Sequence, residues 1–284
     1  MGLDECLNMH LENAGIPESL KLKWKSLIDE LAALPSAVIA YSGGVDSSFL
    51  AYSAAQALGE KMVAVTIVSL IEPPNMLKAA TDFAARHGFK HETISHDPLQ
   101  NPNFRANPAD RCYYCKTDIL HNLWDYARDH QYKVVLEGQN ADDQSDYRPG
   151  RKAVEETGTL SPLAHNGFKK VEIRWLAKAF GLSIWNQPSS PCLATRIPYG
   201  TLISENILDQ IVRAENYLHE RGFKIVRVRY HHDLARIEIE PDQIMALLDL
   251  RKDLVNYFKQ IGFLYVTLDL QGYRLGSMNE GLPL

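Results

Sequence analysis

Two consecutive glycines directly after a short apolar run constrain this chain more than any other feature. Ser36–Tyr41 contains the continuous apolar run Ala-Val-Ile-Ala, which is typical of a strand buried on both faces. Ser42-Gly43-Gly44 follows, and Ser47–Leu58 then has the composition of a helix that closes at Gly59. The backbone must therefore bend sharply from a buried strand into a helix, and glycine tolerates the positive φ that such a bend requires.

Apolar runs and amphipathic stretches continue to alternate up to about residue 188. The predicted strands are Ser36–Tyr41, Met62–Val68, His91–Ser95 and Val134–Leu136. The predicted helices are Leu20–Leu34, which precedes the first strand, and Ser47–Leu58, Met76–His87 and Cys112–His130, which lie between the strands. This alternation predicts an α/β domain over residues 1–188, with a doubly wound parallel sheet and helices on both faces.

The pattern changes after Gln187–Pro191, a short segment rich in Pro and Ser that we interpret as a linker. The elements predicted beyond it are a helix over Glu205–Arg221, strands over Ile225–Tyr230 and Ala235–Ile239, a helix over Ile244–Ile261 and a strand over Leu264–Leu270. We therefore predict a small α+β domain over residues 189–284, for substrate binding or oligomerisation.

Composition excludes several classes of protein. The chain has 284 residues, of which 45% are apolar, and no apolar stretch approaches the ~20 residues of a membrane span. Met1–Glu12 lacks the basic start and apolar block of a signal peptide, so we expect a cytoplasmic protein. The net charge of −5 argues against nucleic acid as a partner.

The bend at the two glycines suits a phosphate group. Successive backbone N–H groups in such a turn point inward, and the start of the following helix adds partial positive charge. Ser42 and Ser47 add hydroxyl donors. No Gly-Lys-Ser/Thr follows, so this is not a Walker loop. The alternative is an ordinary glycine turn in which Asp46 or Ser47 caps the helix.

The string Ser-Gly-Gly-Val-Asp-Ser resembles the signature of the PP-loop ATP pyrophosphatase superfamily. The resemblance implies an enzyme that cleaves ATP between the α- and β-phosphates and transfers AMP to a substrate oxygen. Gly138–Asp143 follows a later strand and is similar to the superfamily's distal motif, so Asn140 and Asp143 are expected at the nucleotide and Asp142 at Mg²⁺. Adjacent carboxylates suit a hard cation beside phosphates, and the alternative is a solvated acidic turn.

Three of the four cysteines form a second candidate site. Cys112 and Cys115 are a C-x-x-C pair at a predicted helix start, and Cys192 lies after the linker. A structural zinc ion would need a fourth ligand, for which Cys6 is the candidate. Three thiolates instead suit a 4Fe-4S cluster whose fourth iron binds a non-protein ligand such as sulfide. A redox pair, buried hydrophobic side chains and Cys192 as a solitary nucleophile remain alternatives.

Further segments are similar to the LarE family. They are Asp146–Gly150, the surroundings of Cys192 with Arg196–Gly200, the stretches Val226–Tyr230 and Ala235–Glu238, and Tyr265–Leu270. The resemblance extends from about Leu20 to Met278. It implies an ATP-dependent sulfur transferase that adenylylates a carboxylate of pyridinium-3,5-biscarboxylic acid mononucleotide and converts it to a thiocarboxylate, for the nickel-pincer nucleotide cofactor.

The LarE resemblance also implies roles for individual residues. Gly43, Gly44 and their flanking residues from Ser42 to Ser47 would bind the pyrophosphate of ATP. Cys192 matches the cysteine that supplies sulfur, which in one branch of the family loses its sulfur and becomes dehydroalanine. Cys112 and Cys115 fit instead the branch in which three cysteines hold a 4Fe-4S cluster and act catalytically. The family also forms homo-oligomers and takes sulfide or another sulfur donor.

Arginines of the predicted second domain suit the phosphate of the mononucleotide. Arg227 and Arg229 alternate on a strand and so project to one face, where the planar guanidinium grips phosphate oxygens, and Arg196 is expected to join them. Glu215 and Glu238 are expected near the same cleft, as in the family, where they would help hold a cation. The alternatives are an exposed basic strand face and surface salt bridges.

Three rival functions share parts of this pattern. A PP-loop tRNA thiolase uses the same ATP chemistry and often three cysteines, but this chain is acidic and has no visible RNA-binding module. An amidating synthetase would use ammonia and needs no cysteine trio. A nucleotide sensor would bind ATP without releasing pyrophosphate.

Overall fold

The computed structural model describes residues 15–73, 75–144 and 150–274. Cys6 and most of the LarE-like segment Asp146–Gly150 lie outside the described residues. None of the helices in the described ranges has a stretch long and apolar enough to cross a membrane.

The chain divides into two compact units. Unit 1 takes in the chain up to Ser69, Pro74–His96 and Cys112–Ser190. Unit 2 takes in Leu70–Pro73, Asp97–Arg111 and the chain from Pro191. The division after Ser190 falls within the segment interpreted as a linker, but two short earlier segments join unit 2. They do so because Ile71 and Asn107 form backbone hydrogen bonds with Leu193 and Gly200.

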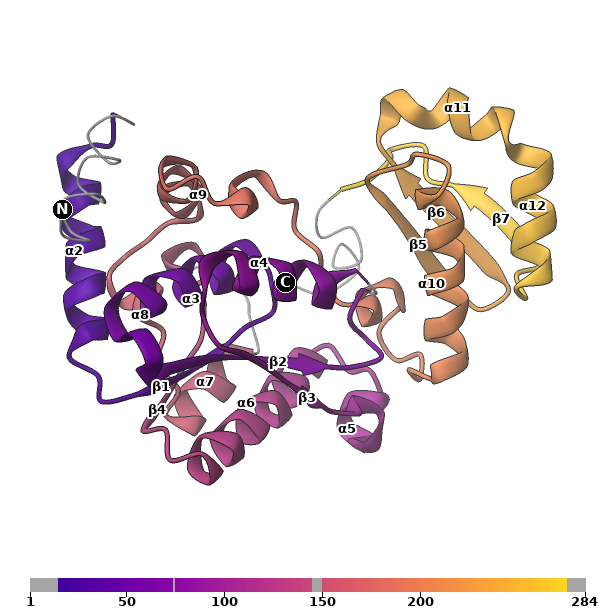
Figure 1. Ribbon diagram of the computed structural model, residues 1–284. Coiled ribbons are helices and arrows are strands. Elements are labelled where there is room, and N and C mark those ends of the chain that lie inside the picture. Colours follow the sequence, from indigo (N-terminus) through magenta and orange to yellow (C-terminus); the bar gives the residue numbers. More distant parts are fainter. Residues whose placement is uncertain (1–14, 74, 145–149, 275–284) are drawn as a thin grey trace. The chain divides into compact units, whose positions relative to one another are not determined.

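Unit 1 is built on a four-stranded parallel sheet, in the order β3-β2-β1-β4 (Figure 1). Its strands are β1 (Ala37–Ala40), β2 (Met62–Val68), β3 (His91–Ser95) and β4 (Val134–Leu136). All four strands predicted from the sequence are confirmed. The central position of β1 brings its carboxyl end, where the two glycines follow, to the middle of the sheet edge at which ligands of α/β folds bind.

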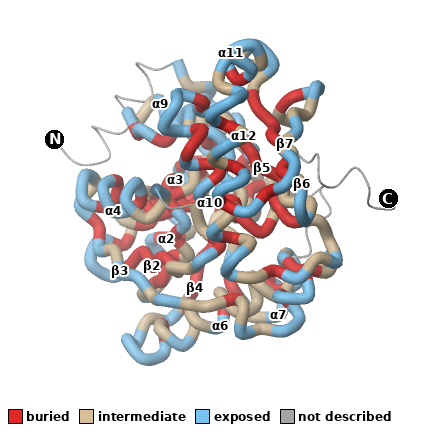
Figure 2. The backbone as a smooth tube through the Cα atoms, turned by 90° about the vertical axis from the view of Figure 1, so that its right-hand side faces the viewer, coloured by how far each residue is buried: buried red, intermediate tan, exposed pale blue. Residues whose placement is uncertain are grey.

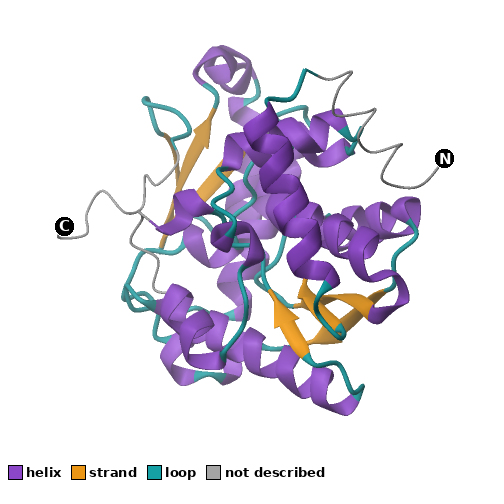
Figure 3. Ribbon diagram, turned by 90° about the vertical axis from the view of Figure 1, so that its left-hand side faces the viewer, coloured by secondary structure: helices purple, strands orange, loops and turns teal. Residues whose placement is uncertain are grey.

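Helices cover both faces of this sheet, as the doubly wound fold requires. The helices of unit 1 are α2 (Glu18–Ala32), α3 (Val45–Leu58), α4 (Met76–His87), α6 (Arg111–Asp129, whose first residue belongs to unit 2), α7 (Gly150–Thr157), α8 (Pro162–His165) and α9 (Lys170–Ala179). Ala37 and Ile39 face the core formed with α2, α3, α4 and α9. Val38 faces the opposite core, formed with α6 and α7. Figures 2 and 3 show the buried strands and the helices around them.

Unit 2 contains a three-stranded sheet with one apolar and one polar face. Its strands, in the order β5-β6-β7, are β5 (Val226–His231), β6 (Leu234–Ile239) and β7 (Tyr265–Leu268). Strands β5 and β6 are antiparallel, and β7 is parallel to β6. The apolar face packs on α10 (Glu205–His219), α11 (Ile244–Asp249) and α12 (Arg251–Gln260). The small helix α5 (Pro102–Arg105) also belongs to unit 2.

One element of unit 2 differs from the prediction. The single helix expected over Ile244–Ile261 is two helices, because Leu250 leaves the helical region with φ −87° and ψ 0°. Apolar residues recur at helical spacing on both sides of Leu250, so the sequence pattern does not mark the break.

Candidate functional site

The turn between β1 and α3 is held in shape by its own serines. The hydroxyl oxygens of Ser42 and Ser47 lie 3.1 Å apart, and the backbone N–H of Ser42 donates to Ser47 Oγ over 3.3 Å. Ser47 Oγ in turn donates to the carbonyl oxygen of Gly44. Gly43 has φ +73°, and a Cβ added there would lie 3.0 Å from the Cβ of Ala80. Gly43 is therefore required both by its backbone conformation and by its neighbour.

The first turn of α3 presents backbone N–H groups at this bend. Gly44 is the N-cap residue, and it provides no side chain to bond the first N–H groups of this 14-residue helix. These groups and the helix dipole favour an anion. Asp46 does not act as a simple cap, because its carboxylate accepts hydrogen bonds from Asn140 and Lys170.

Gly138 brings the second predicted loop directly against the first. A Cβ at Gly138 would lie 2.9 Å from the backbone nitrogen of Ser47 and 3.1 Å from its Cα. Only glycine permits so close an approach of two backbones. The chain has just left β4 at this point, so the loop that follows β4 is in direct backbone contact with the first turn of α3.

Asn140 ties the two loops together through its side chain. It is buried, and its Nδ2 donates to Asp46 Oδ2 over 3.1 Å. Its Oδ1 accepts the backbone N–H of Asp142, and its own N–H donates to Asp143 Oδ2. Asn140, Asp142 and Asp143 thus form a fixed turn, the 3-10 helix η3 (Ala141–Gln144), beside Asp46.

Lys170 completes this junction, although no sequence pattern singled it out. Its Nζ lies 2.7 Å from Asp46 Oδ2, and its backbone N–H donates to Asp142 Oδ2 over 2.8 Å. The other carboxylate oxygen of Asp46, Oδ1, is buried and has no hydrogen-bond partner among the described residues. A lysine at the start of α9 belongs to no local motif, because it reaches the site only through the tertiary fold.

Glu137 is a second residue that the sequence did not reveal. It is buried at the end of β4 and accepts hydrogen bonds from Ser161 Oγ and from the backbone N–H of Gln139. Lys116 Nζ, on α6, lies 3.1 Å from its Oε2. Glu137 therefore links the helix that carries Cys112 and Cys115 to the loop that begins at Gly138.

Cys112 and Cys115 occupy the first turn of α6, as predicted. Residues three apart share one face of a helix, so both thiols lie on the same side of α6. Cys112 is exposed, and Cys115 is half-buried. The alternative of buried hydrophobic side chains is therefore wrong for Cys112. Within residues 15–73, 75–144 and 150–274, no three His, Cys, Asp or Glu side chains gather closely enough to hold a metal ion.

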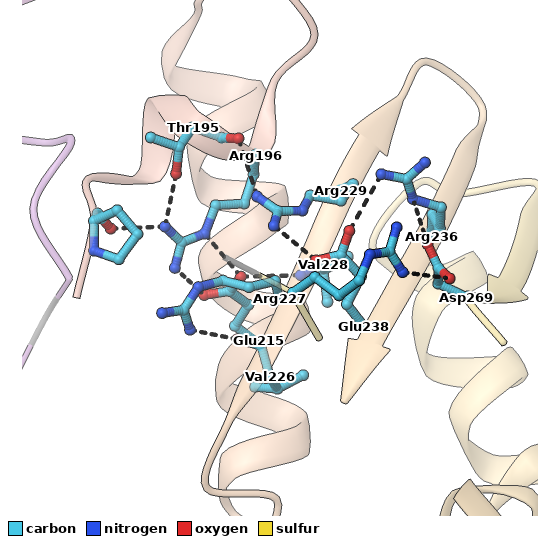
Figure 4. Close-up of polar contacts among 12 residues, drawn as sticks. Thr195, Arg196, Glu215, Val226, Arg227, Val228, Arg229, Arg236, Glu238 and Asp269 are labelled. Carbon is cyan, nitrogen blue, oxygen red and sulfur yellow. Dashed lines mark hydrogen bonds and ion pairs between the residues drawn. The ribbon is translucent and has the colours of Figure 1, made fainter. Parts of the chain in front are cut away.

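Cys192 lies in unit 2, where Arg196 fixes its backbone. Arg196 is almost fully buried, and its Nη1 donates to the carbonyl oxygens of Pro191 and Cys192 over 2.7 and 3.0 Å. Its Nε and Nη2 donate to the two carboxylate oxygens of Glu215 (Figure 4). Glu215 also accepts the backbone N–H of Val228. Arg196 thus connects the Cys192 segment to α10 and β5.

The polar face of the unit 2 sheet is a buried cluster of charges (Figure 4). Arg229 Nη2 donates to Glu238 Oε2 over 2.7 Å, and Arg236 Nη2 lies 3.2 Å from Glu238 Oε1. Arg229 also donates to the carbonyl oxygen of Thr195. Arg227 and Arg229 do project to one face, but this face is buried, so the alternative of an exposed basic strand face is wrong.

Arg227 lies beside this cluster, and the contacts described for it are with a backbone carbonyl and an aromatic ring. Its Nη1 donates to the carbonyl oxygen of Val226, and its guanidinium lies 5.3 Å from the ring centre of Tyr273. Burial is the main cause that lowers the pKa of Arg227, and the nearby positive charge of Arg196 lowers it further. Glu215 and Glu238 are both buried and bonded to arginines, so the alternative of surface salt bridges is wrong. The cation-binding role of the two glutamates stays a prediction.

Comparisons with known proteins agree with this architecture. The NAD synthase family model matches residues 18–108. An uncharacterized protein of Synechocystis sp. is 42% identical over 265 residues, which cover 93% of this chain and 99% of that protein. The pyridinium-3,5-bisthiocarboxylic acid mononucleotide synthase of Lactiplantibacillus plantarum is 35% identical over 265 residues, which cover 93% of this chain and 96% of the synthase. The NH₃-dependent NAD⁺ synthetase of Staphylothermus marinus is 29% identical over 182 residues, 60% of this chain and 63% of the synthetase.

Proposed function

The chain belongs to the LarE-type family of PP-loop enzymes, and we propose that it is an ATP-dependent sulfur transferase that forms AMP and pyrophosphate. Its proposed substrate is pyridinium-3,5-biscarboxylic acid mononucleotide, one carboxylate of which becomes a thiocarboxylate for the nickel-pincer nucleotide cofactor. The relative from Lactiplantibacillus plantarum, a pyridinium-3,5-bisthiocarboxylic acid mononucleotide synthase, supports this substrate class.

The junction of the two loops at Asp46 carries the proposal. Asn140 and Lys170 both reach the Asp46 carboxylate, and Gly138 holds the second loop against the start of α3. In the proposed complex, the bend from Ser42 to Ser47 holds the pyrophosphate of ATP through hydroxyl and backbone N–H groups. Asn140 and Asp143 then contact the nucleotide from the second loop.

Mg²⁺ fits this junction. Asp46 Oδ1 is buried without a hydrogen-bond partner among the described residues, and a buried carboxylate oxygen needs a cation or a donor. Asp46 and Asp142 would hold the ion, since carboxylate oxygens are its preferred protein ligands. An ion held there would neutralise charge on the phosphates of ATP.

The proposed reaction has two steps. A carboxylate oxygen of the substrate bonds to the α-phosphorus, and the bond to the bridging oxygen breaks, so that pyrophosphate leaves with the electron pair. Backbone N–H groups of the Gly43–Ser47 bend stabilise the charge that develops on this leaving group. A sulfur nucleophile then bonds to the carbonyl carbon, and AMP leaves with the former carboxylate oxygen.

We assign the sulfur chemistry to Cys112, Cys115 and Cys192. Three thiols match in number and type the ligands of a 4Fe-4S cluster, and Cys112 and Cys115 share one face at a helix start, where the dipole favours thiolates. Such a cluster would supply one iron that is open to an external sulfide. Without it, the thiolate of Cys192 is the sulfur source, and the protein acts once.

We assign recognition of the substrate phosphate to Arg227 and Arg229, because both project from β5 on its polar face. Arg196 lies next to them, but three of its nitrogens already bond to Glu215, Pro191 and Cys192. We therefore propose that Arg196 acts on the substrate chiefly by fixing the backbone of Cys192.

Mass spectrometry of the protein and the substrate tests the proposal. After incubation with ATP, Mg²⁺ and sulfide, we expect AMP, pyrophosphate and the thiocarboxylate. Iron and acid-labile sulfide analysis of anaerobically prepared protein distinguishes the cluster from a Cys192 that has lost its sulfur. In the Cys192→Ala variant we expect the adenylate without sulfur transfer. Sulfur transfer at the wild-type rate by this variant would contradict the assignment.

An amidating activity is the second candidate, because the NAD synthase model matches residues 18–108. Replacing sulfide by ammonia in the same incubation separates the two. An amide product without thiocarboxylate would favour the synthetase. The proposal further includes a cytoplasmic location, sulfide or another sulfur donor, and assembly into a homo-oligomer, and it includes neither nucleic acid nor a membrane as partner.

A further inference from the structure

Lys170, at the start of α9, is the counter-ion of Asp46. Its Nζ lies 2.7 Å from Asp46 Oδ2, and no other cation among the described residues forms an ion pair with this carboxylate. The side chain of Lys170 is 40% exposed, whereas that of Asp46 is 17% exposed. A partly exposed lysine is a flexible, strongly hydrated cation, and its ion pairs contribute little to stability. This pair can therefore open with only a small change in free energy.

The backbone of Lys170, unlike its side chain, is fixed against the second loop. Its N–H donates to Asp142 Oδ2 over 2.8 Å, and the N–H of Ala141 donates to the carbonyl oxygen of Phe168 over 2.7 Å. Asp142 is the other carboxylate that we assign to Mg²⁺. Lys170 therefore contacts both proposed ligands of the ion, Asp142 through its backbone and Asp46 through its ammonium group.

Asp46 keeps its orientation without the help of Lys170. Asn140, which is buried, donates from Nδ2 to Asp46 Oδ2 over 3.1 Å. The second carboxylate oxygen, Oδ1, is buried and has no hydrogen-bond partner within the described ranges. A carboxylate held in this way can exchange one cation for another without turning. Two cations at one carboxylate repel each other unless further negative charge is present, and the phosphates of ATP would supply that charge.

We propose that Lys170 excludes Mg²⁺ from Asp46 until ATP binds, and that its ammonium group then moves from this carboxylate to a phosphate oxygen. Asp46 belongs to the bend assigned to the phosphates, so an ammonium group 2.7 Å from its carboxylate needs only a small movement to reach them. The inference rests on the proposed function and deepens it, because it makes the binding of the cation and the binding of ATP depend on each other.

Binding of Mn²⁺ to the full chain, measured by electron paramagnetic resonance, tests this exchange. Mn²⁺ replaces Mg²⁺, and the α,β-methylene analogue of ATP, which cannot be cleaved between the α- and β-phosphates, replaces ATP. In Lys170→Gln we expect Mn²⁺ alone to bind about tenfold more tightly than in the wild type, and the complex of Mn²⁺ with the analogue to bind about tenfold more weakly. Loss of a residue that only supports the fold would weaken both.

Lys178→Gln is the matched control, because it removes an exposed cation of the same helix, whose Nζ lies 4.8 Å from the ring centre of Trp185. Both affinities of this variant should equal those of the wild type. Lys170→Arg keeps the positive charge, so Mn²⁺ alone should bind to it as weakly as to the wild type. If the melting curve shows that Lys170→Gln does not fold, Lys170→Met takes its place.

Two results would overturn the inference. One is that Mn²⁺ alone binds to the neutral Lys170 variant no more tightly than to the wild type, and the other is that the complex with the analogue binds to this variant undiminished. If the wild-type protein does not bind the complex at all, the proposed phosphate site fails and the exchange fails with it. If the wild type binds the complex and the variant matches it in both measurements, only the exchange is wrong.

Discussion

The polar sites of the two units consist of different chemical groups. In unit 1, the bend after β1 and the loop after β4 form a site from backbone groups, small residues and one carboxylate, and glycines at 43 and 138 make the close contacts. In unit 2, long charged side chains meet on one face of a sheet, where Arg229 and Arg236 share the carboxylate of Glu238. The first site forms only where no side chain separates closely packed backbones. The second is stable only where each buried charge is paired with an opposite charge.

This difference predicts how each site responds to substitution. A backbone site is damaged by an added atom and by the loss of its central carboxylate, and the loss appears mainly in nucleotide chemistry. A buried charge cluster is damaged by the loss of one charge, because its partner stays buried without compensation. Three substitutions and one change of pH follow, from the largest expected effect to the smallest.

Asp46→Asn should have the largest effect on activity. The change removes the charge that faces Lys170 and the buried oxygen assigned to Mg²⁺. We expect pyrophosphate release to fall about 10²–10³-fold, as when one preorganised electrostatic contact of an active site is lost. Asp82→Asn, at an exposed ion pair on α4, is the control and should keep full activity. A smaller than tenfold loss would contradict the central place of Asp46.

Glu215→Gln should have the largest effect on stability. It leaves the guanidinium of Arg196 buried without its carboxylate, and breaking a buried pair in this way costs about 3–5 kcal/mol. Urea unfolding measures the loss, and Asp209→Asn, at an exposed pair on the same helix, should be nearly neutral. If both variants unfold alike, the charge cluster of unit 2 does not depend on compensation and the contrast between the sites fails.

Gly138→Ala should affect both stability and nucleotide binding. The added Cβ would lie 2.9 Å from the backbone nitrogen of Ser47, so one of the two loops must move. Overpacking of this kind costs about 1–3 kcal/mol. Thermal unfolding and ATP titration should both change, whereas Gly150→Ala, whose Cβ would lie 3.5 Å from Lys116, should leave both intact. If the ATP affinity of Gly138→Ala is unchanged, the second loop does not contribute to nucleotide binding.

Acidification should have the smallest effect on stability, and we expect protonation of His91 on β3 to cause it. Its Nε2 lies 2.8 Å from Thr66 Oγ1, which donates to the carbonyl oxygen of Tyr41 next to the bend. Burial lowers the pKa of His91 below its ordinary value of 6.5, so the unfolded chain binds the proton more readily than the folded protein. Stability is therefore full above pH 6.5 and declines as the pH falls below it.

The measurement is the melting temperature at about pH 7.5 and about pH 5.5. In His91→Gln the difference between the two should be smaller than in the wild type. An equal difference in both proteins would show that other groups, such as the half-buried His87, account for the acid sensitivity.

The sequence predicted the first site better than the second for a physical reason. Gly43 and Gly138 sit where no other residue fits, so the backbone requirement appears directly as a local motif. Lys170 and Glu137 have no such signal, because their contacts with Asp46 and Lys116 depend on how α9 and β4 pack. In unit 2, Arg227 and Arg229 were identified, but their burial and the pairing with Glu238 follow from strand register, which alternation alone does not fix.

Titration of the protein with ATP and Mg²⁺ by calorimetry tests the central claim most directly, namely that the bend between β1 and α3 binds the phosphates of ATP. The account predicts saturable, Mg²⁺-dependent binding that Asp46→Asn and Gly138→Ala weaken and that Arg227→Gln, in unit 2, leaves unchanged. Absence of binding by the wild-type protein, or binding that is the same in Asp46→Asn, would contradict it.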